Sequence, residues 1–283
     1  MKILSRMPFA LLYLLSDIVS FVLNYGVKYR RKVVEKNLKN SFPSASDKEL
    51  KQMRNGFYTH FTDVFLEFFK GLTISKQEIE KRINFENINL LRDELDKDQP
   101  ILLVLGHHGN WEWIIHYLNI NKLNSDIVYK SLSSSFFDNL TNTIRTHFGT
   151  QYLTLLRKEE AVRATLERRK LTRILILAAD QVPGVDSAHW ITFLGQDTGF
   201  FRGPEKFALQ LNYPVYYMQM IRVKRGFYTL SCKKIAQPPY HSVKEGDILK
   251  VFAQHLEQTI TAHPSQYLWS HKRWKYQKPK SDV

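Results

Sequence analysis

ILLVLGHHGNWEW, residues 101–113, places an uninterrupted apolar run directly before two histidines and a glutamate. An apolar run without polar alternation is typical of a strand that is buried on both faces of a parallel sheet. Open α/β sheets bind their ligands where such strands end. The segment therefore predicts a buried strand over 101–106, a helix over 110–120 and a functional site between them.

The two chemically active side chains of this segment are His107 and Glu112. Five residues apart, they cannot share a face of one continuous helix, because each helical residue turns by about 100°. We therefore expect His107 in a turn from Gly106 to Gly109, with Asn110 opening the helix. In this arrangement Glu112 would hydrogen-bond one ring nitrogen of His107, leaving the other to remove a proton from an alcohol.

The spacing alone is weak evidence, because 10 His and 27 acidic residues in 283 positions predict about one such pair by chance. One alternative is structural, with His107 and Glu112 only capping a helix through local hydrogen bonds. Another is a metal site formed by His108, Glu112 and a distant ligand, although no HExxH motif supports it. A serine hydrolase is excluded by the absence of a G-x-S-x-G motif.

The rest of the chain alternates strand-like apolar runs with helical patterns and contains no linker or internal repeat. This alternation predicts one α/β domain with a central mixed sheet flanked by helices. The expected helices are 47–70, 134–148 and 244–263, the expected strands 126–130 and 173–180, and the expected antiparallel pair 214–223 with 227–235.

Residues 8–25 are almost wholly apolar, about the length that crosses a bilayer. A basic block follows them and no small-residue cleavage site is present, which favours a retained anchor over a secretory signal. We therefore expect residues 1–27 to anchor the protein and residues 28–283 to form the catalytic domain in the cytoplasm. Because Asp17 lies in mid-run, two arrangements remain open: a spanning helix, and a helix that lies in the membrane interface or packs on the catalytic domain.

The amino-acid composition limits the classes of partner that the protein is expected to bind. With 41 Lys+Arg against 27 Asp+Glu, the formal charge of +14 indicates a polyanionic partner, such as nucleic acid, an anionic membrane or a phosphorylated ligand. No nucleic-acid-binding signature accompanies that charge, which argues against nucleic acid. The single cysteine, Cys232, excludes an intrachain disulfide and a cysteine-cluster metal site.

Five segments together resemble the lipid A lauroyl/myristoyl acyltransferase family, within the wider glycerophospholipid acyltransferase superfamily. They are GHHGNWEW (106–113), VYKSLSSSFFDNL (128–140), AADQVPG (178–184), FLGQDTGFFRGPEKFALQLNYPV (193–215) and QYLWSHKRWK (266–275). The resemblance implies transfer of a fatty acyl chain from acyl carrier protein or coenzyme A to a hydroxyl of a lipid A precursor, without a cofactor, at the anionic inner membrane. An aminolipid or a lysophospholipid is the alternative acceptor.

The resemblance also implies roles for individual residues. His107 matches the general base and Glu112 its partner. The implied substrate-binding residues are Asn110, Lys130, Asp180, Gln181, Arg202 and Lys206. Arg202 and Lys206 flank Gly203-Pro204, where a helix start and two cations could bind phosphate or simply face solvent. Asp180 could equally bond backbone amides of a local turn, so a structural role for it also remains open.

Overall fold

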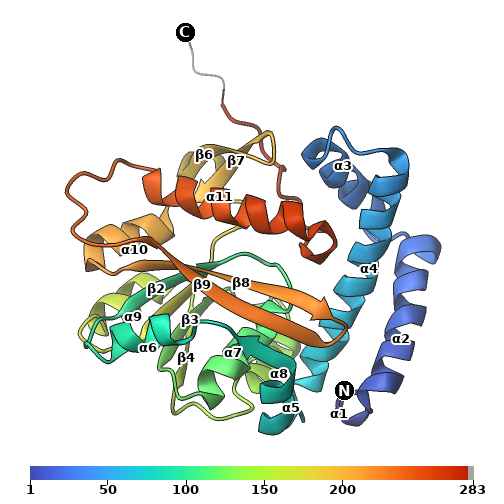
Figure 1. Cartoon of the computed structure of the whole chain (residues 1–283), viewed down its shortest axis with the longest axis horizontal. Helices are drawn as coiled ribbons and strands as arrows, with labels where there is room; N and C mark the ends of the chain where they lie inside the picture. Colours follow the sequence, from blue (N-terminus) through green and yellow to red (C-terminus); the bar gives the residue numbers. More distant parts are fainter. Residues whose placement is uncertain (280–283) are drawn as a thin grey trace.

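The computed structural model describes residues 1–279, so residues 280–283, the end of the expected catalytic domain, lie outside the described part. Its centre is a seven-stranded sheet in the order β1-β9-β8-β2-β5-β3-β4 (Figure 1). The strands are β1 (Ile83–Phe85), β2 (Ile101–Leu105), β3 (Ser125–Tyr129), β4 (Leu153–Arg157), β5 (Ile174–Ala178), β8 (Val215–Lys224) and β9 (Phe227–Ala236). The predicted α/β class with a central mixed sheet is confirmed.

The strand β2 lies in the middle of the sheet because it is apolar on both faces. It pairs in parallel with β5 on one side and β8 on the other, and all five of its residues are buried. Leu102 and Val104 pack with α11 (Asp247–Ala262) in one core, whereas Leu103 and Leu105 pack with α7 (Trp111–Ile120) in the other. The catalytic candidates therefore follow the most buried strand of the fold.

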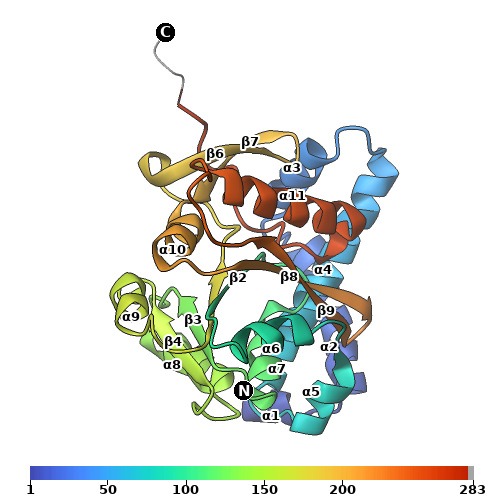
Figure 2. The ribbon, with the colours of Figure 1, turned by 60° about the vertical axis from the view of Figure 1, so that its left-hand side comes forward.

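Helices cover both faces of the sheet (Figures 1 and 2). On one side lie α11 and α10 (Gly203–Leu211), and on the other lie α5 (Lys76–Arg82), α6 (Asn89–Leu95) and α7. The remaining helices are α1 (Lys2–Arg6), α2 (Phe9–Phe21), α3 (Arg31–Ser41), α4 (Asp47–Lys70), α8 (Ser135–Arg145) and α9 (Ala161–Glu167), and the hairpin β6–β7 (Ala188–Phe193, Gln196–Phe201) forms a second sheet.

Most of the predicted elements are present. The helix expected over 47–70 has these bounds, because Ser46 and Glu49 form a reciprocal capping box at its start. The antiparallel pair expected near the C-terminal third is β8–β9, and Cys232 is buried in β9. The helix expected over 134–148 is shorter, since α8 ends at Arg145.

The apolar N-terminal segment forms α2 and a short π-helical turn, Val22–Gly26. By length and composition, Phe9–Gly26 could cross a membrane. In the structure this segment packs lengthwise against α4 at the edge of the molecule, as Figures 1 and 2 both show. It is thus attached to the α/β domain rather than projecting from it.

Candidate functional site

The site is built on the turn that joins β2 to α7. Gly109 has a φ of +64°, and a Cβ there would lie 2.1 Å from the carbonyl oxygen of Met220, so only glycine fits. The C-terminal segment holds the turn from outside, because the Gly109 amide donates to the Gln266 carbonyl and the Leu268 amide donates to the His107 carbonyl. The backbone around His107 is therefore held between β8, through Met220, and the C-terminal segment, through Gln266 and Leu268.

The His107 ring is held by Asp180. Nδ1 of His107 lies 2.6 Å from Oδ1 of Asp180, and the His107 backbone amide donates to Oδ2 at 2.9 Å. Asp180 follows β5, the neighbour of β2, so the two parallel strands deliver both residues to the same edge of the sheet. Asp180 is 2% exposed, and its carboxylate is oriented by both bonds.

The other ring nitrogen of His107 faces an amide. Nε2 lies 3.3 Å from the Nε2 amide of Gln181, which can only donate. The hydrogen-bond pattern assigns the proton to Nδ1, facing Asp180, and leaves the lone pair of Nε2 as an acceptor. This is the tautomer that a general base requires.

Glu112 does not make the hydrogen bond that we expected from the sequence. Instead of bonding the His107 ring, its carboxylate forms a two-pronged pair with Arg145, with Nε to Oε2 at 3.0 Å and Nη2 to Oε1 at 2.8 Å. Arg145 lies at the end of α8, which packs against α7. A planar guanidinium satisfies both oxygens of a largely buried carboxylate, whereas an imidazole can satisfy one.

The two pairs, His107 with Asp180 and Glu112 with Arg145, change the pKa values of their own members and of each other's. Burial lowers the pKa of His107, but the charge and hydrogen bond of Asp180, with a further contribution from Glu112, outweigh burial and raise it above 6.5. Burial is the largest influence on the pKa of Asp180 and raises it, yet the charge and the two hydrogen bonds of His107, with the charge of Arg273, together lower it to about 2. For Glu112, too, the nearby Arg145 outweighs burial and lowers the pKa. Both carboxylates are therefore ionised at neutral pH.

A model of bacterial lipid A biosynthesis acyltransferases matches residues 1–276 of the chain. The chain belongs to that family. No curated protein sequence matches it at significant similarity. Membership establishes that the protein is an acyltransferase of lipid A biosynthesis, and the remaining site residues can be considered in that light.

Two further side chains, those of Arg273 and His271, lie near Asp180 in this acyltransferase. Arg273 is 2% exposed; it donates to the Gly199 carbonyl at 2.7 Å and lies over the ring of Phe200, and its charge contributes to the low pKa of Asp180. His271 accepts from the Val182 amide at 3.3 Å. Neither residue was singled out from the sequence, although both lie in the C-terminal segment that carries the family resemblance.

Three predicted residues lie close to His107 or to Glu112. Gln181 contacts the His107 ring. Lys130 is exposed, and it lines the same cavity as Glu112. Asn110 is fully buried, accepts from the Trp113 amide as the cap of α7 and donates to Glu67 at 2.7 Å. Its position favours a structural role over the predicted substrate contact, because both polar atoms of the side chain are already engaged.

The predicted phosphate site has a different form from the one we expected. Arg202 precedes α10 and turns back to pair with Glu245 at 3.2 Å and to donate to the Ala188 carbonyl. Lys206 is exposed. Within residues 1–279 no hydrogen bond or ion pair connects either cation to His107 or Glu112. Arg202 is therefore already engaged by Glu245 and by the Ala188 carbonyl, and a phosphate would have to displace Glu245.

The metal interpretation through His108 is not supported by its surroundings. Both ring nitrogens of His108 lie within 3.2 Å of backbone carbonyl oxygens, those of Met220 and His263. Burial lowers its pKa to about 4, so the ring is neutral. Because Glu112 is bound to Arg145, His108 and Glu112 do not converge on a common point.

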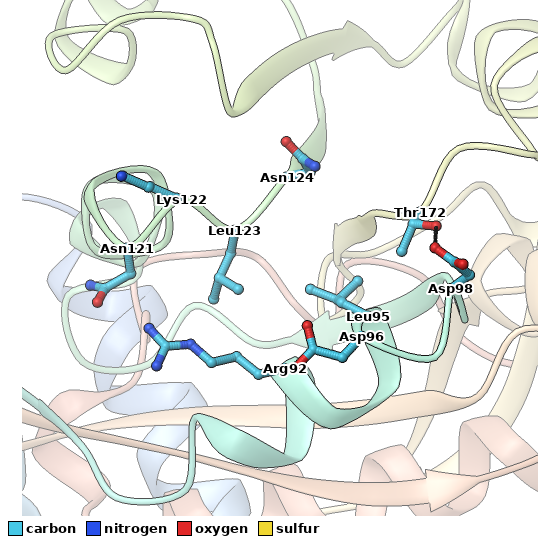
Figure 3. A pocket seen from close by; sticks show the side chains of 9 residues that line it. All are labelled: Arg92, Leu95, Asp96, Asp98, Asn121, Lys122, Leu123, Asn124 and Thr172. Carbon is cyan, nitrogen blue, oxygen red and sulfur yellow. Dashed lines mark hydrogen bonds between the residues drawn. The ribbon is translucent and has the colours of Figure 1, made fainter.

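The cavity beside the site is apolar on one side and charged on the other. It measures about 260 Å³ and extends from the aromatic side chains of α4 to Glu112 and Arg145. A larger cavity of about 370 Å³, lined by Arg92, Asp98 and Lys122 among others, lies at the amino ends of the strands (Figure 3). The smaller cavity is the better candidate, because catalytic groups gather at the carboxyl ends of parallel strands.

Proposed function

We propose that this protein transfers a fatty acyl chain from the thioester of acyl carrier protein or coenzyme A to a hydroxyl of a lipid A precursor, with His107 as general base. The observation that carries the proposal is the His107 ring, whose Nδ1 is bound to Asp180 and whose Nε2 is an acceptor. The centre of this ring lies 5.1 Å from that of Trp111, which lines the apolar cavity. Family membership supports the class of reaction and of acceptor.

In the proposed reaction Nε2 of His107 removes the proton of the acceptor hydroxyl as its oxygen attacks the thioester carbonyl carbon. The tetrahedral intermediate collapses, the carbon–sulfur bond breaks, and the imidazolium returns its proton to the departing thiolate. The products are an ester and a free thiol. Asp180 stabilises the imidazolium between these two proton transfers, since its carboxylate stays ionised.

Glu112 acts in this mechanism through its charge. It is paired with Arg145, and it still contributes to raising the pKa of His107. Arg145 and Lys130 lie at the charged side of the cavity, where they are placed to attract the carbonyl oxygen of the donor or a phosphate of the acceptor. We keep Gln181, Arg202 and Lys206 as proposed substrate-binding residues.

The apolar side of the cavity suits an acyl chain. Phe61, Val64, Phe65 and Phe68 of α4 form this side, and Leu132 lies across from them. Phe65 and Leu132 are both about half exposed, so part of the cavity mouth is apolar, with the exposed Lys130 also at its rim. A lipid chain can enter such a mouth from a membrane without leaving an apolar environment. We therefore propose association with the inner membrane, with the catalytic domain on the cytoplasmic side.

Purified full-length protein is incubated with a lipid A precursor in detergent and with either an acyl–acyl carrier protein or an acyl–coenzyme A, and products are analysed by mass spectrometry. We expect one added acyl ester, lost in His107→Ala. An aminolipid and a lysophospholipid serve as alternative acceptors. Ester formation on one of these alone would reassign the acceptor. No ester from a folded protein with any pair would reject the proposed reaction.

A further inference from the structure

The N-terminal helix α2 is amphipathic in the reverse of the usual sense. Its exposed stripe is apolar, with Leu11, Leu14, Ile18 and Phe21 each more than half exposed. Its stripe against the domain contains the buried residues Leu12, Ser16 and Ser20, and the buried Asn24 of the following π-helical turn continues it, so that three of these four residues are polar. A helix on the surface of a soluble domain buries its apolar stripe and exposes its polar one. The exposed stripe of α2 therefore requires an apolar environment outside the protein.

The polar stripe is bonded to α4 along its length. The Ser16 hydroxyl donates to Asp63 at 2.6 Å, and the Asn24 amide donates to Asn55 at 3.0 Å. Asp17, at mid-helix, pairs at 2.7 Å with Arg225 in the turn between β8 and β9. The acidic residue that would be costly in a lone spanning helix is thus neutralised by a cation of the α/β domain.

The beginning of the N-terminal segment is attached as well. Lys70 donates to the Met7 carbonyl at 2.8 Å, and Thr73 donates to the Ser5 carbonyl at 2.5 Å. Contacts therefore run from Ser5 to Asn24 without a free stretch. If α2 crossed a bilayer in this conformation, α4 and the charged β8–β9 turn would have to enter the hydrocarbon with it, which polar backbone and charged groups oppose.

We infer that α2 lies along the membrane surface with its apolar stripe in one leaflet, so that the protein is attached from one side and does not span the bilayer. The partner is an anionic lipid surface, because cations stand at both ends of the apolar stripe. Lys2 and Arg6 precede it, and Lys28 and Arg30 follow it. A helix lying in the interface brings both sets to headgroups of the same leaflet.

This orientation also places the cavity mouth at the membrane. On α4, Phe65 projects between the direction of Thr62, which bonds Ser16, and that of Phe61, which lines the cavity, at about 100° per residue. The half-exposed ring of Phe65 therefore connects the apolar stripe of α2 with the entrance to the site. The inference deepens the proposed function, because it states how a lipid acceptor would reach His107.

The test measures depth along the helix. In a Cys232→Ser background, single cysteines at Leu11, Leu14, Ile18 and Phe21 carry a spin label. Arg163→Cys on the exposed side of α9, across the molecule from α2, is the aqueous control. Full-length protein is bound to phosphatidylglycerol/phosphatidylcholine vesicles, and accessibility to oxygen and to a nickel chelate gives each label's depth. We expect all four labels within one leaflet at similar depth, about 5–10 Å below the headgroups.

A spanning helix gives a different profile. From Leu11 to Phe21 the helix rises about 15 Å, so a transmembrane orientation would change the depth by nearly that amount. Such a gradient, or labels shielded by a second protein copy without lipid contact, would overturn the inference. If Cys232→Ser fails to fold, Cys232→Ala is the second background, since an apolar replacement suits this buried position.

Assaying ester formation beside label depth, in protein that retains His107, separates the two proposals. If the labels lie at uniform depth but the protein with His107 intact forms no ester, the proposed reaction is rejected and the membrane orientation is retained. A depth gradient in a protein that forms ester would retain the reaction and reject the orientation. Because the labelled side chains are exposed on α2 and none of them lines the cavity, insertion does not depend on catalysis.

Discussion

Two carboxylates at the site have the same chemistry and different partners. Asp180 is bound to the imidazole of His107, and Glu112 is bound to the guanidinium of Arg145. An imidazole exchanges its proton near neutral pH, whereas a guanidinium stays charged. Proton transfer is therefore possible only in the first pair. The second pair supplies a fixed arrangement of charge beside the cavity.

Of the substitutions in the two pairs, removal of the His107 imidazole should have the largest effect on turnover. His107→Ala should lower kcat for acyl transfer by several orders of magnitude, since general-base catalysis alone contributes about 10²–10⁴-fold. The exposed His241 provides a matched control, and His241→Ala should retain near-wild-type turnover. Near-normal turnover in the folded His107→Ala protein would remove His107 from the mechanism.

Replacing one carboxylate at a time distinguishes the two pairs. Asp180→Asn should reduce kcat by about 10²–10⁴-fold, because the imidazolium loses its stabilising charge. The raised pKa of His107 should fall as well, so the acid limb of the kcat–pH profile should move to lower pH. Activity requires neutral His107 and thus rises with pH through this pKa. The measurement is kcat from pH 5 to 9.

Glu112→Gln is the matched comparison, since it removes the other charge and keeps the shape. We expect the same direction of pH shift but a smaller loss, about tenfold, because Glu112 acts on His107 without a hydrogen bond. If Glu112→Gln is more damaging than Asp180→Asn and moves the acid limb further, Glu112 is the true partner of the base, as the sequence suggested.

A third buried carboxylate, Glu67, differs from both of these, because within residues 1–279 it forms no ion pair. Glu67 accepts from Tyr13, Asn110 and Tyr228, and burial raises its pKa to about 7. An acid with a raised folded-state pKa loses stability as pH rises from its unfolded value, about 4.5, to about 7. The loss is of the order of 3 kcal/mol. Glu67→Gln should abolish it.

The measurement is urea unfolding in detergent at pH 5 and pH 8. Wild type should lose stability between these values by more than Glu67→Gln does, with the difference concentrated below about pH 7. Equal pH dependence in the two proteins would mean that Glu67 is ionised at its normal pKa. In that case the hydroxyl and amide donors around it substitute for a cation.

The comparison also shows what the sequence could and could not predict. The strand β2 and the position of His107 were predictable, because an apolar run, a glycine turn and a helix start are local signals. The hydrogen-bond partner of the His107 ring was not predictable from such local signals. Asp180 lies 73 residues away, and it reaches the ring only because β5 pairs with β2. Such neighbours are set by sheet order, which no local pattern encodes.

Arg145 had no sequence signal at all. It is one of 41 cations, and it meets Glu112 because α8 packs on α7. Short elements such as β1 and β4 were missed for a related reason, since three to five partly exposed residues give little periodicity. The polar stripe of α2 was visible as Ser16, Ser20 and Asn24, but its direction toward the domain required α4 to be in place.

The smallest effect is expected where a cation is paired at the surface. Arg202 is 41% exposed and its partner Glu245 is 63% exposed, so breaking the pair costs about 0–1 kcal/mol of stability. If Arg202 releases Glu245 to bind acceptor phosphate, Arg202→Ala should lower kcat/KM by about tenfold for a phosphorylated acceptor and less for the dephosphorylated one. Arg202→Lys should restore part of the loss, because an ammonium lacks the planar fork. Glu245→Ala is the matched control; it frees Arg202 and should maintain or increase kcat/KM. Equal losses on both acceptors would assign Arg202 to the fold, through its bond to the Ala188 carbonyl.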